Sequence, residues 1–201
     1  MGLKFIFATM NSGKSLDLLS LAHNLQDENI PFIVLKSEID TRDGEHTIHS
    51  RAIPGGRPCI PVSSEDDVVK IVEENSDINT LKYVLVDEVQ FLTPEQIEQF
   101  AYLVDEYNID VICYGLKTDF KTKLFPASQR LFEIADEFYK IDSYTQYEGN
   151  SYKTMFNARL NSEGNIVVNG KQVEVGGEER YKAISRKEYF RRTKHPLYNK
   201  I

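Results

Sequence analysis

A glycine, a lysine and a serine stand together near the start of the chain, where they could hold a phosphate group. The stretch ATMNSGKS, residues 8–15, follows the phosphate-binding loop pattern G-x-x-x-x-G-K-[ST], except that Ala8 replaces the first glycine. In such a loop, backbone N–H groups and the lysine surround the phosphates of a nucleotide, and the hydroxyl holds Mg²⁺. We therefore predict a nucleotide contact at each of Ala8, Thr9, Met10, Asn11, Ser12, Gly13, Lys14 and Ser15.

Two adjacent carboxylates end the apolar run YVLVDE, residues 83–88. The run predicts a strand that is buried on both faces of a parallel sheet. Asp87 and Glu88 would then lie at the carboxyl edge of that sheet, where α/β proteins bind their ligands. One carboxylate can bind Mg²⁺ and the other can accept a proton from an attacking hydroxyl or water. A solvent-exposed acidic pair is the alternative interpretation.

Strand and helix patterns alternate over residues 1–142, which predicts an α/β domain with a P-loop parallel sheet flanked by helices. The expected strands cover 3–8, 32–36, 83–88, 109–115 and a short segment near 138–141. The expected helices cover 13–28, about 64–74 after Ser63 or Ser64, and a segment from Pro94 that Thr93 caps. Residues 37–58 are polar and rich in turn formers, so we expect a long loop there.

Residues 143–190 differ in character, with many Tyr and Asn residues and hairpin-like text such as RLNSEGNIVVNGKQVEV. We predict a small β-containing C-terminal domain that forms a lasso or flap over the substrate. Residues 191–201 are expected to form a basic, solvated tail.

Composition limits the classes of partner. The 201 residues carry a formal net charge of −7, which disfavours binding to nucleic acid or to an anionic membrane surface. No run approaches the ~20 apolar residues of a membrane span. Only Cys59 and Cys113 are present, so neither a disulfide framework nor a cysteine zinc site is expected. These features favour a location in the reducing cytoplasm.

Four blocks of sequence resemble one family. ATMNSGKS resembles the loop GPMFSGKS of thymidine kinases, and DEVQF resembles their DEAQFF. YGLKTDFKTKLF (114–125) is similar to their YGLRTDF block, and VGGEERYKAISRKEY (175–189) is similar to their VGG–Tyr segment. The chain therefore resembles the type II thymidine kinases from residue 3 to about 190. The resemblance implies transfer of the γ-phosphoryl group of ATP to the 5′-hydroxyl of thymidine or deoxyuridine, which gives dTMP in pyrimidine salvage.

The resemblance also implies roles for matching residues. Glu88 is implied as the base that takes the proton of the 5′-hydroxyl, while Lys14 and Arg42 offset charge on the transferred group. Mg²⁺ is implied to bind with ATP at Ser15 and Asp87. Further implied ATP contacts are Asp40, Thr41, Arg42, Asp87, Glu88, Val89 and Gln90. The implied thymidine contacts are Met10, Leu116, Phe120, Phe125, Gln172, Val173, Glu174, Val175, Gly176 and Tyr181. For Leu116 and Phe125, core packing is an equally open interpretation.

The chain departs from the family at the structural zinc that usually ties the small domain. The aligned ligand positions hold Tyr147, Asn150, Ser185 and Glu188. Because these do not form a Cys/His set, no structural zinc is expected. An aromatic cluster of Tyr147, Tyr152, Phe156 and Tyr189 could replace it. The family also implies a homotetramer and feedback inhibition by dTTP.

Two other functions stay open at this point. In a P-loop ATPase, Glu88 would activate water, but the YGL–DF block would have no explanation. A degenerate protein would bind nucleotide or nucleoside without turnover. The retention of Lys14, Ser15, Glu88 and Tyr181 argues against this alternative.

Overall fold

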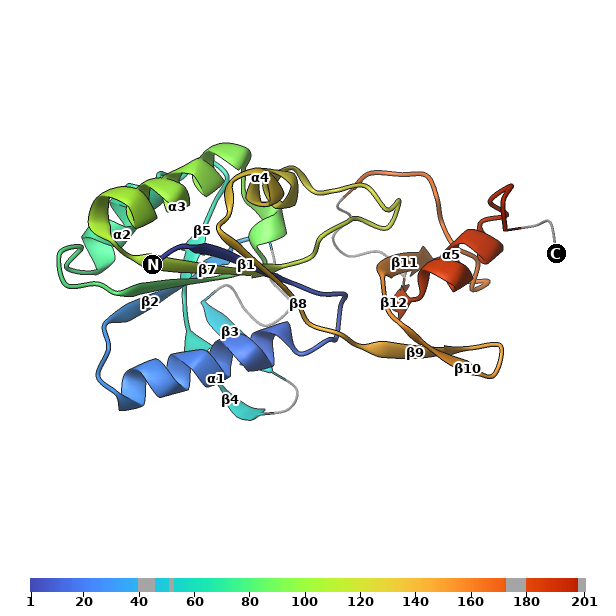
Figure 1. The fold of residues 1–201 in the computed structure, drawn as a ribbon, viewed down its shortest axis with the longest axis horizontal. Helices are drawn as coiled ribbons and strands as arrows, with labels where there is room; N and C mark the ends of the chain where they lie inside the picture. The colour runs from blue at the N-terminus through green and yellow to red at the C-terminus, as the bar shows by residue number, and fades with distance from the viewer. Residues whose placement is uncertain (40–45, 51–52, 173–179, 199–201) are drawn as a thin grey trace.

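The computed structural model describes residues 1–39, 46–50, 53–172 and 180–198 (Figure 1). Its centre is a six-stranded sheet with the order β5-β2-β6-β7-β1-β8, and every neighbouring pair is parallel. The strands are β1 (Leu3–Phe7), β2 (Phe32–Ser37), β5 (Ile60–Val62), β6 (Tyr83–Asp87), β7 (Asp110–Gly115) and β8 (Glu137–Lys140). The predicted α/β fold with a parallel sheet is confirmed.

Helices cover both faces of the sheet (Figure 1). Helix α1 (Lys14–Asp27) lies on one face, and α2 (Val68–Asn75), α3 (Pro94–Tyr107) and α4 (Pro126–Ile134) lie on the other. Each face has its own cluster of buried apolar residues, one around α1 and one beneath α2, α3 and α4. No helix among the described residues is both long enough and apolar enough to cross a membrane.

Side-chain caps fix where helices α2 and α3 begin. The predicted start of α3 is confirmed, since Thr93 and Gln96 form a capping box and Pro94 is the first residue of the helix. The predicted start of α2 near residue 64 is wrong. The carboxylate of Asp67 accepts from the N–H groups of Val69 and Lys70, so the helix begins at Val68. Helix α4 was not expected from the sequence.

The segment expected to be one long loop contains a hairpin. Strands β3 (Thr47–Ser50) and β4 (Ile53–Pro58) pair antiparallel beside α1 (Figure 1). Ile48 is fully buried in the cluster around α1, and the guanidinium of Arg57 lies 5.3 Å from the ring centre of Phe32. The burial of Ile48 gives the β3–β4 hairpin an apolar anchor, which explains why these two strands form in a stretch of mostly polar residues.

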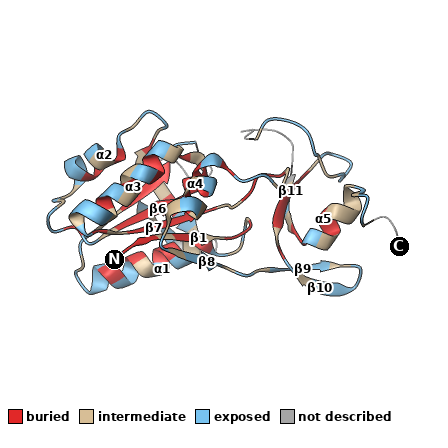
Figure 2. Cartoon of the chain, turned by 45° about the horizontal axis from the view of Figure 1, so that its top comes forward, coloured by how far each residue is buried: buried red, intermediate tan, exposed pale blue. Residues whose placement is uncertain are grey.

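The C-terminal part consists of two antiparallel pairs and one helix. Strand β9 (Tyr144–Tyr147) pairs with β10 (Asn150–Lys153), and β11 (Phe156–Leu160) pairs with β12 (Arg180–Ile184). Helix α5 (Arg186–Arg192) follows. The buried residues of this part form a small separate cluster, and β9 and β10 are mostly exposed (Figure 2). The first two residues of the predicted basic tail belong to α5.

The four positions aligned with zinc ligands have other partners. Ser185 caps α5, and the buried carboxylate of Glu188 pairs with Arg192 at 3.1 Å and with Lys182 at 3.4 Å. The rings of Tyr189 and Phe156 pack at 5.2 Å, as expected. Tyr152 instead accepts a hydrogen bond from Lys187, so the expected four-membered aromatic cluster is only partly formed. Tyr147 and Asn150 lie in the exposed β9–β10 hairpin.

Candidate active site

The phosphate loop joins β1 to α1 at the carboxyl edge of the sheet. Gly13 adopts a left-handed conformation with φ of 88° immediately before the helix, which glycine reaches without steric cost. Lys14 is buried, and its Nζ donates to the backbone oxygen of Thr9 at 3.1 Å. Because the first N–H groups of a helix have no partner inside it, α1 presents donors and a positive dipole end to this loop.

Ala8 fits the loop in place of glycine. It is buried, and its N–H donates to the backbone oxygen of Gly115 at 3.3 Å. Ala8 is not among the residues with a positive φ. Its methyl group therefore causes no backbone strain, and the departure from the loop pattern is compatible with a working phosphate site.

The two carboxylates at the end of β6 are buried and close together. Asp87 Oδ1 accepts from the N–H of Glu88 at 3.0 Å. Burial, together with the charge of Glu88, raises the pKa of Asp87 to about 7, while Lys14 and Lys36 act in the opposite direction. Glu88 itself has φ of 50° and ψ of 38°. A left-handed glutamate at the end of a buried strand is a local strain of the kind found at functional sites.

Gln90 connects Glu88 to the neighbouring strand. Its side-chain nitrogen donates to Glu88 Oε2, and its side-chain oxygen accepts from the N–H of Leu116 at 2.8 Å. A Cβ at Gly115 would lie 2.6 Å from that oxygen and 2.8 Å from Val89 Cγ1. The glycine of the YGL block is therefore required because Gln90 and Val89 pack directly against it.

The predicted substrate residues from the YGL–DF block lie in two different settings. Phe120 is buried, and the guanidinium of Arg159 lies 4.1 Å from the centre of its ring. The hydroxyl of Tyr189 donates to the backbone oxygen of Phe120 at 2.9 Å. Phe125 precedes α4 and packs edge-on against Phe91 at 5.9 Å. The block thus contacts the C-terminal part through Phe120 and the 3₁₀ turn after β6 through Phe125.

Met10, Gln172 and Tyr181 are further predicted thymidine contacts in the described part of the chain. The N–H of Met10 donates to Asn157 Oδ1 at 2.8 Å, and the side chain of Gln172 donates to Asp119 Oδ2 at 3.2 Å. Tyr181 lies in β12 opposite Arg159. The predicted contacts that fall outside the described residues are Asp40, Thr41, Arg42, Val173, Glu174, Val175 and Gly176.

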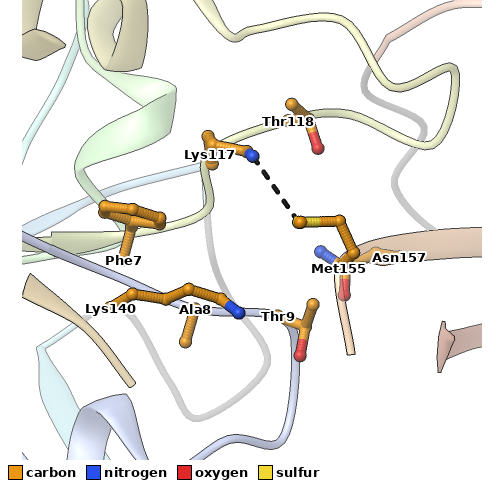
Figure 3. Close-up of a pocket in the computed structure, with 8 residues that line it drawn as sticks. All are labelled: Phe7, Ala8, Thr9, Lys117, Thr118, Lys140, Met155 and Asn157. Carbon is orange, nitrogen blue, oxygen red and sulfur yellow. Dashed lines mark hydrogen bonds between the residues drawn. The ribbon is translucent and has the colours of Figure 1, made fainter. Parts of the chain in front are cut away.

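A pocket lies between the phosphate loop and the C-terminal part (Figure 3). Ala8 and Thr9 line one side, and Met155 and Asn157 line another. Lys117 also lines it, with its Nζ 3.8 Å from the sulfur of Met155. Burial, and secondarily the charge of Lys140, lowers the pKa of Lys117. The pocket places the loop that should hold phosphate next to residues from two other segments.

Sequence reasoning missed several residues of this region. Lys36 is almost fully buried at the end of β2, in register with Asp87 on β6. A lysine inside the apolar run FIVLK was a signal that could have indicated it, since buried lysines need a partner. Arg159 and Asn157 are also buried, but no pattern in the sequence separates them from ordinary strand residues.

The residues present are compatible with Mg²⁺. Among the described residues there is no group of three or more His, Cys, Asp or Glu side chains placed to hold a metal ion. Mg²⁺ does not need such a cage, because it commonly binds one or two carboxylates together with substrate phosphates and water. The buried carboxylate of Asp87, whose pKa is raised in the absence of a cation, offers a suitable oxygen ligand near the loop that carries Ser15.

Known proteins that are similar to this chain include enzymes of one family. The family model "Thymidine kinase" matches residues 1–189. A thymidine kinase of Streptococcus pyogenes is 36% identical over 189 residues, covering 94% of this chain and 96% of that protein. A thymidine kinase of Shewanella oneidensis is 35% identical over 187 residues, covering 93% and 95%. Among solved structures, flagellar accessory protein FlaH from Methanocaldococcus jannaschii aligns with a TM-score of 0.45 at 12% identity, covering 76% of each chain. From the family match and the relatives, the chain belongs to the thymidine kinase family.

Proposed function

We propose that this protein transfers the γ-phosphoryl group of ATP to the 5′-hydroxyl of thymidine or deoxyuridine. The observation that carries the proposal is the buried Glu88 carboxylate, which Gln90 holds at the sheet edge where the phosphate loop also lies. A carboxylate fixed beside a phosphate loop can receive a proton from an acceptor hydroxyl. Family membership makes thymidine the expected acceptor.

Each residue then has a defined task. Glu88 accepts the proton of the 5′-hydroxyl as its oxygen attacks the γ-phosphorus and ADP leaves. Lys14 and the N–H groups at the start of α1 hold the phosphates, and Arg42 offsets charge on the transferred group. Ser15 and Asp87 would hold Mg²⁺, which neutralises phosphate charge when it is bound. Gln90 keeps the Glu88 carboxylate in a fixed orientation.

The base is recognised by apolar walls and by backbone groups. Met10, Leu116, Phe120 and Phe125 would supply the walls, and Tyr181 would lie on the sugar side. Residues 172–176 would close over the base with their main chain. Thymine presents acceptor, donor and acceptor groups along one edge, whereas cytosine has a donor at N4. Cytosine would leave buried backbone groups unpaired, so we expect it to be rejected strongly.

A phosphorylation assay with radiolabelled thymidine and deoxycytidine as competitor tests this function. Thymidine-dependent formation of dTMP with little competition supports it. Hydrolysis of ATP at the same rate with or without thymidine would identify an ATPase instead. Binding of both substrates without turnover would identify a degenerate protein. As further parts of the same proposal, dTTP acts as a feedback inhibitor and the protein is a homotetramer, which inhibition kinetics and light scattering can check.

A further inference from the structure

Hydroxyl groups from two distant parts of the chain meet at the phosphate loop. Thr9 Oγ1 lies 2.8 Å from Thr154 Oγ1 and 3.1 Å from Ser143 Oγ. Ser12 Oγ lies 2.8 Å from Thr9 Oγ1 and 2.9 Å from Ser143 Oγ. We call Thr9, Ser12, Ser143 and Thr154 the hydroxyl cluster. Two of its members belong to the phosphate loop and two to the C-terminal part.

A neighbouring residue binds the backbone of the same loop. Asn157 Oδ1 accepts from the N–H of Met10 at 2.8 Å. Thr9, Thr154 and Asn157 are all buried. A buried polar group that has no hydrogen-bond partner destabilises the folded protein. The folded state therefore favours the loop conformation in which these hydrogen bonds form.

The hydroxyl cluster is attached to a regular element. Thr154 N–H donates to the backbone oxygen of Ser143 at 2.8 Å, so the two residues close the base of the β9–β10 hairpin. The next residue, Met155, donates its N–H to the oxygen of Ile184 at the end of β12. Both antiparallel pairs of the C-terminal part therefore contribute to the position of Ser143 and Thr154 against the loop.

We propose that Ser143, Thr154 and Asn157 are positioning residues that hold Thr9 and Met10 in the loop conformation that binds the phosphates of ATP. This inference rests on the proposed function. A phosphate loop acts by presenting several N–H groups to one ligand at once, and a loop that is ordered before binding loses less entropy when the ligand arrives. Asn157 occupies the Met10 N–H, which leaves phosphate binding to the later part of the loop and the start of α1.

The test removes one hydroxyl without changing the volume of the side chain. Thr154→Val should weaken MgATP affinity about tenfold, because the buried hydroxyl that holds Thr9 is lost. Affinity is measured by calorimetry without thymidine. Thr154→Ser, which keeps the hydroxyl, should bind within about threefold of the original protein. In steady-state kinetics the KM for ATP should rise while the KM for thymidine changes less than about twofold.

Thr145→Val is the matched control. Thr145 lies in β9, and within the described part of the chain its hydroxyl makes no hydrogen bond. The proposal is wrong if Thr154→Val binds MgATP as well as Thr145→Val does, or if Thr154→Ser fails to restore binding. If Thr154→Val does not fold by circular dichroism, Ser143→Ala carries the same test, and unchanged MgATP affinity in that variant rejects the proposal.

The direct binding measurement separates this proposal from the function itself. If the original protein binds MgATP but forms no dTMP, the proposed function fails while the effect of Thr154 on affinity still decides the role of the hydroxyl cluster. If it forms dTMP and Thr154→Val keeps full affinity, only the positioning role fails. A protein that binds no MgATP overturns both.

Discussion

The side-chain nitrogen of Gln90 donates to the carboxylate of Glu88, two residues earlier in the chain. Glu88 has a left-handed backbone, and Gln90 follows in a short 3₁₀ turn, so both side chains return to the same sheet edge. The side-chain oxygen of Gln90 accepts in turn from the N–H of Leu116, the residue that follows β7. The position of the proposed base therefore depends on two neighbouring strands.

Glu88→Gln should lower kcat by roughly 10²–10⁴, the usual contribution of a positioned base. The amide keeps the shape of the side chain but cannot accept the proton of the 5′-hydroxyl. Calorimetry should show ATP and thymidine affinities within a few-fold of the original values. Glu95→Gln, at an exposed position in the first turn of α3, is the control and should keep full activity. Near-normal turnover of Glu88→Gln across pH would mean that Glu88 is not the base.

Gly115→Ala should lower both stability and turnover. The new Cβ would meet the side-chain oxygen of Gln90 and a methyl group of Val89 well inside van der Waals contact. Overpacking of this kind costs about 1–3 kcal/mol, and displacement of the base should reduce kcat about 10–100-fold. Chemical denaturation and steady-state kinetics measure the two effects.

A double variant checks the cause. In a Gln90→Ala background, the clash with the side-chain oxygen is absent, so Gly115→Ala should cost less stability than it does alone. Equal costs in the two backgrounds would show that Gln90 is not the group that excludes a side chain at position 115.

The sequence predicted the parts of the site that follow from local patterns. The loop before α1 and the carboxylates after β6 have spacings tied to a strand–loop–helix order, and the parallel sheet then brings them to one edge. The Thr9–Thr154 contact joins residues 145 positions apart, so no local pattern could indicate it. The β3–β4 hairpin was missed for a related reason, because burial of Ile48 against α1 stabilises an otherwise polar segment.

Stability without Mg²⁺ should depend on the protonation of Asp87. Its pKa is about 7 in the folded protein, whereas an exposed aspartate titrates near 4. Between these values the folded state binds a proton that the unfolded state does not bind, so this group increases the free energy of unfolding as pH falls from about 8 to about 5.

Melting temperatures measured with a chelator across this pH range test the expectation. Asp87→Asn should remove the increase and should be the more stable protein at pH 8, because it buries no charge. Asp105→Asn changes an exposed aspartate of α3 and should keep the pH dependence of the original protein. An unchanged pH dependence in Asp87→Asn would assign the effect to another group.

The C-terminal part should be stable without zinc and should depend on Glu188 instead. Glu188 lies at one of the positions aligned with the family's zinc ligands, where its buried carboxylate pairs with Lys182 and Arg192. Glu188→Gln should lower the free energy of unfolding by about 1–3 kcal/mol, since a buried amide replaces a charge-assisted hydrogen-bond acceptor. Glu163→Gln, at an exposed turn, should change stability by less than about 0.5 kcal/mol.

Elemental analysis should find well under one zinc per chain, and a strong chelator followed by Mg²⁺ should leave melting temperature and activity unchanged. Stoichiometric zinc whose removal unfolds residues 143–190 would mean that cation ligands lie at other positions and that the Glu188 ion pairs are not what holds this part together.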